Sequence, residues 1–268
     1  MKRIGIVPVS KGAGAGFVTA MLATELAAIT GAGGAVTVNA PGGITVVELG
    51  RGNLFDQLCA DRWFRVRQMV SYWNCLHGEG QIERIRNPYC GVNWLLRTPE
   101  DKGNLIDRST IDRSTEETTK ETGNDWLEYT LERGRAVKLL YSLPGDVAFV
   151  DFSAMNEADM LYLLEDMDQL VAVVDPMPSK LLEGYEMIHR LKICKKPVVW
   201  TVNRWTDQIE GKELRKILGN ERRMVAIPEV PRGFLYQGEY AGVGMIEHQQ
   251  IRRLMAPGME EIIKRLML

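Results

Sequence analysis

The chain has 268 residues, of which 45% are hydrophobic and 25% are charged, and its formal net charge at pH 7 is −2. These values are typical of a soluble globular protein and give no electrostatic signature of nucleic-acid binding, so no nucleic-acid partner is expected. The four cysteines form no Cys-x-x-Cys pair and the three histidines are isolated, which argues against disulfides and a metal site. No stretch approaches the roughly 18 apolar residues of a membrane span, so we expect a cytoplasmic protein.

Short apolar runs alternate with helical stretches, in the pattern of a parallel sheet covered by helices on both faces. The expected strands are 4–9, 91–97, 147–152, 170–174, 197–202 and 224–227. The expected helices are 17–28, 126–141, 159–165, 181–191, 211–218 and 245–268. Residues 35–39 and 44–49 flank a Pro-Gly-Gly turn, which predicts a β-hairpin. The last helix is expected to break at Pro257-Gly258.

No long linker interrupts this alternation, so the sequence predicts one α/β domain over residues 1–268, with a mostly parallel sheet flanked by helices on both faces. The polar stretch 99–124 contains two adjacent copies of Ile-Asp-Arg-Ser-Thr and almost no apolar residues. It is therefore expected to be a flexible loop, and a lid over a site at the strand ends is the alternative.

A glycine-rich turn follows the first expected strand and leads into the first helix at Phe17. In this place the backbone N–H groups of a turn converge on an anion at the positive end of the helix, which predicts phosphate binding. A plain tight turn between strand and helix is the alternative. The candidate phosphate loop consists of Lys11, Gly12, Ala13, Gly14, Ala15 and Gly16.

This turn resembles the phosphate loop of the MinD/ParA family of P-loop ATPases, whose pattern is Gly-Lys-Gly-Gly-x-Gly-Lys-Thr. The resemblance keeps the family's first lysine as Lys11, which in the family reaches across a dimer to the partner's nucleotide. It places the second lysine, which contacts the β- and γ-phosphates, on Gly16, and the magnesium-binding threonine on Phe17. A glycine and a phenylalanine supply neither the charge nor the hydroxyl group.

The resemblance extends over nearly the whole chain. The family's water-positioning aspartate falls on Gly50, at the end of Val47-Glu48-Leu49-Gly50. Ala148-Phe149-Val150-Asp151 is similar to the Walker B strand, so the resemblance implies that Asp151 holds a magnesium-bound water. A helix-capping aspartate is the alternative for Asp151.

Two further stretches are similar to the nucleoside-binding end of the family. Asn203 and Arg204 end the strand whose asparagine reads adenine, and a carboxamide offers both a donor and an acceptor to a base. Pro228 lies in the strand and proline turn that flank the base. The implied ligand is ATP or ADP, weakly bound, and magnesium is left open because Phe17 replaces its hydroxyl ligand. For Asn203, a turn residue at a strand end is the alternative.

Loss of three catalytic elements predicts a pseudo-ATPase, with no catalytic residue and weak or no hydrolysis, that acts as a scaffold or localisation factor. The resemblance implies a homodimer and a protein partner from an assembly or localisation system. The alternatives are an active ATPase, in which Arg51 or Arg204 replaces the lysine, and an interaction module without nucleotide. The final segment, Met259 to Leu268, loosely resembles a MinD membrane helix, but its two opening glutamates favour packing on the core.

Overall fold

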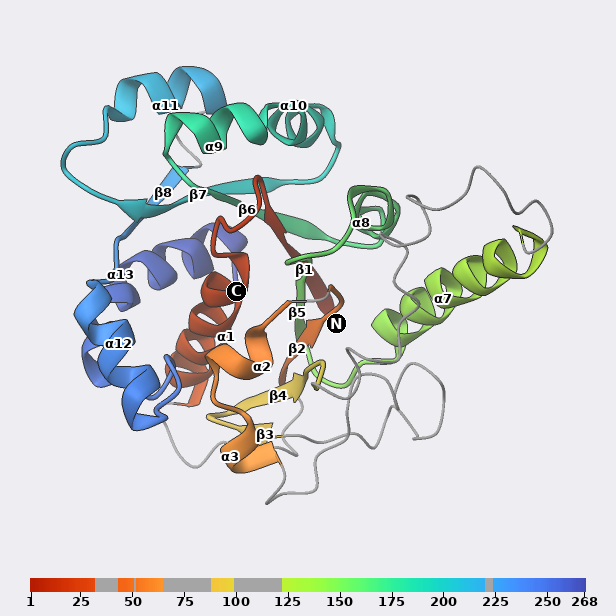
Figure 1. Cartoon of the computed structure of the whole chain (residues 1–268), viewed down its shortest axis with the longest axis horizontal. Helices are drawn as coiled ribbons and strands as arrows, with labels where there is room; N and C mark the ends of the chain where they lie inside the picture. Colours follow the sequence, from red (N-terminus) through yellow and green to blue (C-terminus); the bar gives the residue numbers. More distant parts are fainter. Residues whose placement is uncertain (32–42, 51, 65–87, 99–121, 220–223) are drawn as a thin grey trace.

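The computed structural model describes residues 1–31, 43–50, 52–64, 88–98, 122–219 and 224–268 (Figure 1). In these ranges eight strands form one sheet in the order β3-β4-β2-β5-β1-β6-β7-β8. Every pairing is parallel except that of β3 with β4, so the expected mostly parallel α/β fold is confirmed. The strands are β1 (Lys2–Pro8), β2 (Ile44–Glu48), β3 (Pro88–Tyr89), β4 (Val92–Leu95), β5 (Val147–Asp151), β6 (Gln169–Val174), β7 (Val198–Trp205) and β8 (Met224–Pro228).

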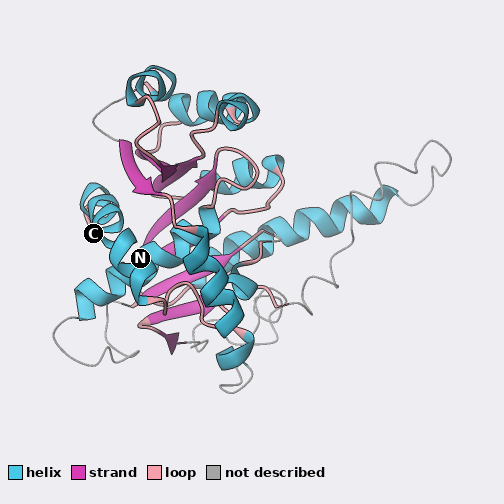
Figure 2. Cartoon of the chain, turned by 60° about the vertical axis from the view of Figure 1, so that its left-hand side comes forward, coloured by secondary structure: helices cyan, strands magenta, loops and turns pink. Residues whose placement is uncertain are grey.

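Helices cover both faces of this sheet, as the side view shows (Figure 2). One apolar core lies between the sheet and α1, α12 and α13, and the other lies between the sheet and α7, α8, α10 and α11. The described helices are α1 (Ala15–Gly31), α2 (Leu54–Gln57), α3 (Asp61–Phe64), α7 (Thr122–Ser142), α8 (Glu157–Leu164), α9 (Pro178–Glu183), α10 (Tyr185–Ile193), α11 (Gly211–Leu218), α12 (Arg232–Ala241) and α13 (Gln249–Leu266).

The central strands carry mostly apolar residues because both of their faces are covered. All five residues of β2 are buried. On β5 the side chain of Phe149 packs into the core beside α1, whereas Ala148 and Val150 pack into the opposite core. This is the alternation of side chains that a strand imposes.

Helix α1 is enclosed by the sheet and α13, and it has no charged residue in its first or last turn. Its two buried threonines satisfy their hydroxyl groups within the helix. Thr19 donates to the carbonyl of Ala15 at 2.9 Å and Thr24 to that of Ala20 at 2.8 Å. Packing against the sheet and α13 therefore fixes the position of α1, and with it the turn that precedes the helix.

Two expectations about local structure are wrong. Strand β2 pairs in parallel with β4 on one side and with β5 on the other, which leaves no edge of β2 for the expected hairpin partner. Residues 35–39 lie outside the described residues. Helix α13 continues through Pro257, although a break was expected there. Gly258 in the next position is buried against the backbone of β8, so close packing holds the helix together at this point.

The end of the chain packs on the core, and most of the expected loop at 99–124 lies outside the described residues. The apolar residues Met259, Ile262, Ile263 and Leu266 of α13 are buried. Helix α7 begins at Thr122, inside the stretch expected to be a loop. Among the helices that the structure describes, none combines the length and apolarity needed to cross a membrane.

A glycine divides the expected helix 181–191 into α9 and α10. A Cβ atom on Gly184 would lie 2.5 Å from the carbonyl oxygen of Val9, at the end of β1. Only a residue without a side chain allows this approach, which places the end of α9 beside the glycine-rich turn.

We predict that Gly184→Ala lowers the free energy of unfolding by about 1–3 kcal/mol, because the new methyl group overlaps Val9. The matched control is Gly134→Ala, on the exposed side of α7, where a Cβ atom meets nothing within 4 Å. That change should stabilise the chain by up to about 1 kcal/mol through helix propensity. Urea unfolding of both variants tests the prediction, and equal effects of the two changes would contradict it.

Candidate functional site

The candidate site lies at the edge of the sheet where the carboxyl ends of the parallel strands meet, which is where ligands bind in open α/β sheets. The turn from β1 to α1 crosses this edge. Gly12 and Gly14 have φ angles of 78° and 88°, in the left-handed region that glycine adopts without strain. Because α1 begins at Ala15, the N–H groups of its first turn have no acceptor within the helix.

Two residues at the end of β7 hold the carbonyl groups of this turn. The Nδ2 of Asn203 donates to the carbonyl of Ala13 at 2.9 Å, and the Nη2 of Arg204 donates to that of Gly12 at 3.0 Å. Asn203 is buried, and a Cβ atom on Gly14 would overlap its side-chain nitrogen. Arg204 also forms an ion pair with the buried carboxylate of Asp175, which follows β6. The turn is thus tied to the strands behind it.

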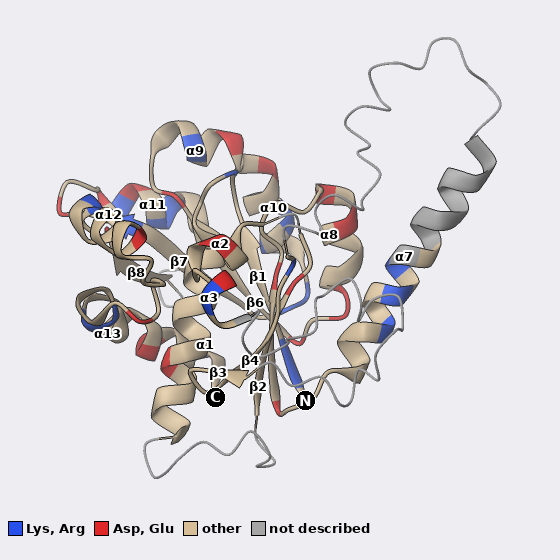
Figure 3. Ribbon diagram, turned by 60° about the horizontal axis from the view of Figure 1, so that its bottom comes forward, with Lys and Arg blue, Asp and Glu red and all other residues tan. Residues whose placement is uncertain are grey.

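The opposite side of the turn meets a carboxylate from α9. The Lys11 N–H donates to Oε1 of Glu183 at 2.9 Å. Glu183 is paired through its other oxygen with Lys180, one turn earlier on α9, at 2.7 Å. Figure 3 shows that α9 carries both basic and acidic residues. The hydrogen bond from Lys180, followed by that from Lys11, lowers the pKa of Glu183. One N–H of the candidate phosphate loop is therefore already bonded to an anion of the same chain.

Asp151 ends β5 behind the turn and is completely buried. Its Oδ1 accepts from the N–H and the hydroxyl of Ser153, at 2.9 and 2.6 Å. Its Oδ2 has no hydrogen-bond partner among the described residues. Burial raises the pKa of Asp151 to about 6, and the bonds from Ser153 oppose that rise.

Gly16 lies against two acceptor atoms that have no donor within the described part of the chain. A Cβ atom on Gly16 would lie 3.3 Å from Oδ2 of Asp151 and 3.6 Å from Oε1 of Gln57. Both of these oxygen atoms are buried without a hydrogen bond. The space beside Gly16 thus presents acceptors, which suits a donor or a cation better than an anion.

Position 50 has no room for a side chain. A Cβ atom on Gly50 would overlap the carbonyl of Ser153 and lie 2.8 Å from the nitrogen of Met155. The neighbouring carboxylate is Glu48, which is buried. It accepts from the N–H groups of Leu54 and Arg97, both at 3.0 Å, and so joins the ends of β2 and β4 to the start of α2.

A cavity of about 570 Å³ opens beside the turn. Gly14 of the turn and Phe17 of α1 line it, together with Asn203 and Arg204 from β7. The segment after β8 and helix α12 close the other side. The rings of Phe234 and His248 lie 5.7 Å apart in this wall. The remaining lining residues are Gln57, Cys59, Glu229, Val230, Arg232, Leu235, Gly238, Glu239, Val243, Met245 and Ile251.

The structure brings most of the sequence-predicted site residues together at this edge. Gly14, Phe17, Asn203 and Arg204 face the cavity, and Asp151 lies directly behind Gly16. Pro228 is separate from them: it ends β8, pairs with Trp205, and is not among the residues that line the cavity.

Sequence reasoning missed Glu183, Gln57 and the whole of α12. Only α12 carries a start signal, Pro231, which stands at its N-cap position. Glu183 and Gln57 lie in short segments of mixed apolar and polar residues without a distinctive pattern, and their place beside the turn depends on tertiary packing.

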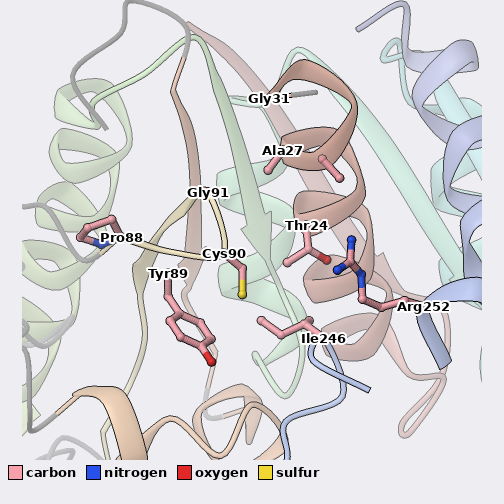
Figure 4. A pocket seen from close by; sticks show the side chains of 10 residues that line it. Thr24, Ala27, Gly31, Pro88, Tyr89, Cys90, Gly91, Ile246 and Arg252 are labelled. Atoms are coloured by element: carbon pink, nitrogen blue, oxygen red, sulfur yellow. The ribbon is translucent and has the colours of Figure 1, made fainter. Parts of the chain in front are cut away.

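A second cavity, of about 530 Å³, lies on the other half of α1 (Figure 4). The turn between β3 and β4 and the start of α13 form its walls, with Tyr89, Cys90 and Arg252 among the lining residues. Its α1 residues, Thr24 to Gly31, lie two or more turns beyond the glycine-rich turn. It is therefore separate from the candidate phosphate site.

The strand order and the glycine-rich turn between β1 and α1 define an open, mostly parallel α/β fold with a cavity at the carboxyl ends of its strands. No family model matches the sequence, and no curated protein is similar to it in sequence. Solved structures of the MinD and ParA ATPases do share its fold over the full chain. At these low identities the likeness shows the fold alone.

MinD structures from three organisms illustrate the similarity. The cell-division ATPase MinD of Pyrococcus furiosus is 17% identical, with a TM-score of 0.65 over 99% of this chain and 98% of that one. The septum-site-determining protein MinD of Pyrococcus horikoshii, complexed with Mg-ADP, is 16% identical, with a TM-score of 0.62 over 98% and 96%. The MinC:MinD complex of Aquifex aeolicus is 16% identical, with a TM-score of 0.64 over 100% of this chain and 96% of that one.

We predict that Asp151 makes the chain less stable as the pH rises from about 4 to about 6. The folded state keeps the proton up to about pH 6, whereas an unfolded chain releases it near the ordinary value of 3.8. The folded state thus binds more protons between these pH values, and the free energy of unfolding falls by about 3 kcal/mol across them. Asp151→Asn should remove this loss.

Urea unfolding of the wild type and of Asp151→Asn at pH 4, 6 and 8 measures the effect. Ser153→Ala serves as the second variant, since without the hydroxyl bond the pKa of Asp151 rises further and the loss extends to higher pH. Parallel pH profiles for wild type and Asp151→Asn would show that Asp151 ionises as in the unfolded chain.

Proposed function

We propose that the chain is an adenine-nucleotide-binding pseudo-ATPase of MinD/ParA-like fold that acts as a scaffold or localisation factor. The cavity beside the turn carries this proposal. It runs from Gly14 to the segment after β8, and its volume of about 570 Å³ lies in the range of small-molecule sites. Phe17 lines this cavity without filling it, which supports a ligand site over a closed interaction module.

The residues at the turn do not fit a magnesium-bound triphosphate. Gly16 and Phe17 offer no ammonium group and no hydroxyl group, and Gly50 has no space for a carboxylate. Asp151 is the carboxylate that borders Gly16, and it stands there with an acceptor oxygen that has no donor in the described structure. These features support binding without efficient hydrolysis, because the groups that stabilise charge in the transition state are lacking.

A rearranged ATPase receives less support. Arg204 is engaged with Asp175 and the Gly12 carbonyl, so it is not free to replace the lysine without breaking the attachment of the turn. Arg51 lies outside the described residues.

The proposed role needs partners. The MinD of Aquifex aeolicus has been solved in complex with MinC, and by analogy we propose a homodimer with a protein partner in the cytoplasm. Apolar side chains near the turn are available for such contacts: Met177, Leu182 and Tyr185 are exposed by 60%, 78% and 61%. Lys11 is exposed on the same turn.

Thermal-shift and calorimetric titrations with adenine nucleotides test the proposed function. A ligand at a hundredfold excess over its Kd stabilises the folded state by about 2.7 kcal/mol, and we expect that stabilisation with or without magnesium. No phosphate should be released. Phe234→Ala should weaken binding because it removes a wall of the cavity, while Tyr240→Ala, on the same helix with a side chain 84% exposed, should not.

Two results would contradict the proposal. Turnover that depends on magnesium would identify an active ATPase. The absence of any shift with AMP, ADP and ATP at millimolar concentration would leave an interaction module on a P-loop fold.

A further inference from the structure

The phosphate end of the proposed nucleotide site is surrounded by hydrogen-bond acceptors. The Oδ2 of Asp151 and the Oε1 of Gln57 border Gly16, and both are buried without a donor among the described residues. On the other side of the turn the carboxylate of Glu183 accepts a hydrogen bond from the Lys11 N–H. With its pKa at about 6, Asp151 is ionised at pH 7.5, so two of these three groups are negative.

Donors line the cavity itself, whereas Asp151 and Glu183 are not among its lining residues. The cavity meets the turn at Gly14 and Phe17, where the first N–H groups of α1 face an incoming ligand. Arg232 also lines the cavity, and Arg204 lines it while its guanidinium group stays bonded to Asp175 and to the Gly12 carbonyl. A single phosphate at Gly14 is therefore within the reach of amide and guanidinium donors.

Additional phosphates would have to continue along the turn, past Gly14 toward Gly16 or Lys11. There they would meet Asp151 and Gln57 on one side and Glu183 on the other. Negative charges a few ångström apart near a protein surface repel each other strongly, and Gly16 and Phe17 provide no compensating charge.

Building on the proposed nucleotide site, we propose that it takes a nucleoside monophosphate and discriminates against the triphosphate, through the acceptors of Asp151, Gln57 and Glu183 around the turn. Gly16 and Phe17 stand where a complete phosphate loop has the lysine and the hydroxyl that favour a triphosphate.

Calorimetric titration of the wild type at pH 7.5 with adenosine, AMP, ADP and ATP, each with and without magnesium, tests this inference. We expect AMP to bind more tightly than adenosine, because the first phosphate meets donors. ATP should bind at least about tenfold more weakly than AMP, because its outer phosphates meet acceptors.

Charge-removing variants locate the cause. Glu183→Gln and Asp151→Asn should each lower the ratio of the ATP dissociation constant to the AMP dissociation constant by about threefold to tenfold. The dissociation constant of AMP itself should change little. Glu186→Gln is the matched control, since it removes the same charge from an exposed position on the next helix and should leave the ratio unchanged. The double change Gly16→Lys with Phe17→Thr should shift the preference toward ATP with magnesium.

The outcomes separate this inference from the proposed function. If ATP binds as tightly as AMP or more tightly, the inference fails and the nucleotide site stands. If adenosine binds as tightly as AMP, the phosphate contributes nothing and the inference also fails. If none of the four ligands binds, the nucleotide site itself is wrong. An equal effect of Glu183→Gln and Glu186→Gln would show that overall charge, and not the contact with Lys11, sets the preference.

Discussion

The structure depends on the attachment of the glycine-rich turn to β7. A turn between a buried strand and a buried helix has few ways to satisfy its carbonyl groups, and here Asn203 and Arg204 provide the donors for Ala13 and Gly12. Asp175 holds Arg204 in place from the end of β6. The carboxyl ends of three parallel strands, β1, β6 and β7, are thereby joined. Asn203 and Arg204 also line the cavity. This attachment gives Asn203 a structural task whether or not it also contacts a base.

The electrostatic character of the site follows from what surrounds the turn. In a low-dielectric environment an acceptor without a donor is costly, and a protein retains such a group where a ligand, water or proton can satisfy it. Asp151 responds to burial with a raised pKa, while Glu183 finds partners on its own helix and on the turn. The two carboxylates therefore lie on opposite sides of the turn: Asp151 beside Gly16, and Glu183 bonded to the Lys11 N–H. Both act against further negative charge.

Much of the fold could be predicted because apolar runs of strand length alternate with helical stretches, and parallel strands covered on both faces produce that pattern. The expectations that fail are those in which distant segments decide. The Pro-Gly-Gly turn predicts that the run 44–49 belongs to a hairpin, but β4 and β5 pair with the two edges of this strand. Pro257 should end a helix by local rules, yet burial of α13 against α1 and β8 maintains it.

By itself the sequence determined the fold class, the position of the glycine-rich turn, and the absence of a lysine and a hydroxyl at Gly16 and Phe17. These are properties of local pattern and residue type. The tertiary structure alone decided that position 50 excludes a side chain, that Glu183 reaches the Lys11 N–H, and that Asp151 and Gln57 face Gly16. These contacts join residues about 40 to 170 positions apart, and their distances depend on how helices pack over the ends of the sheet. No local pattern encodes such distances.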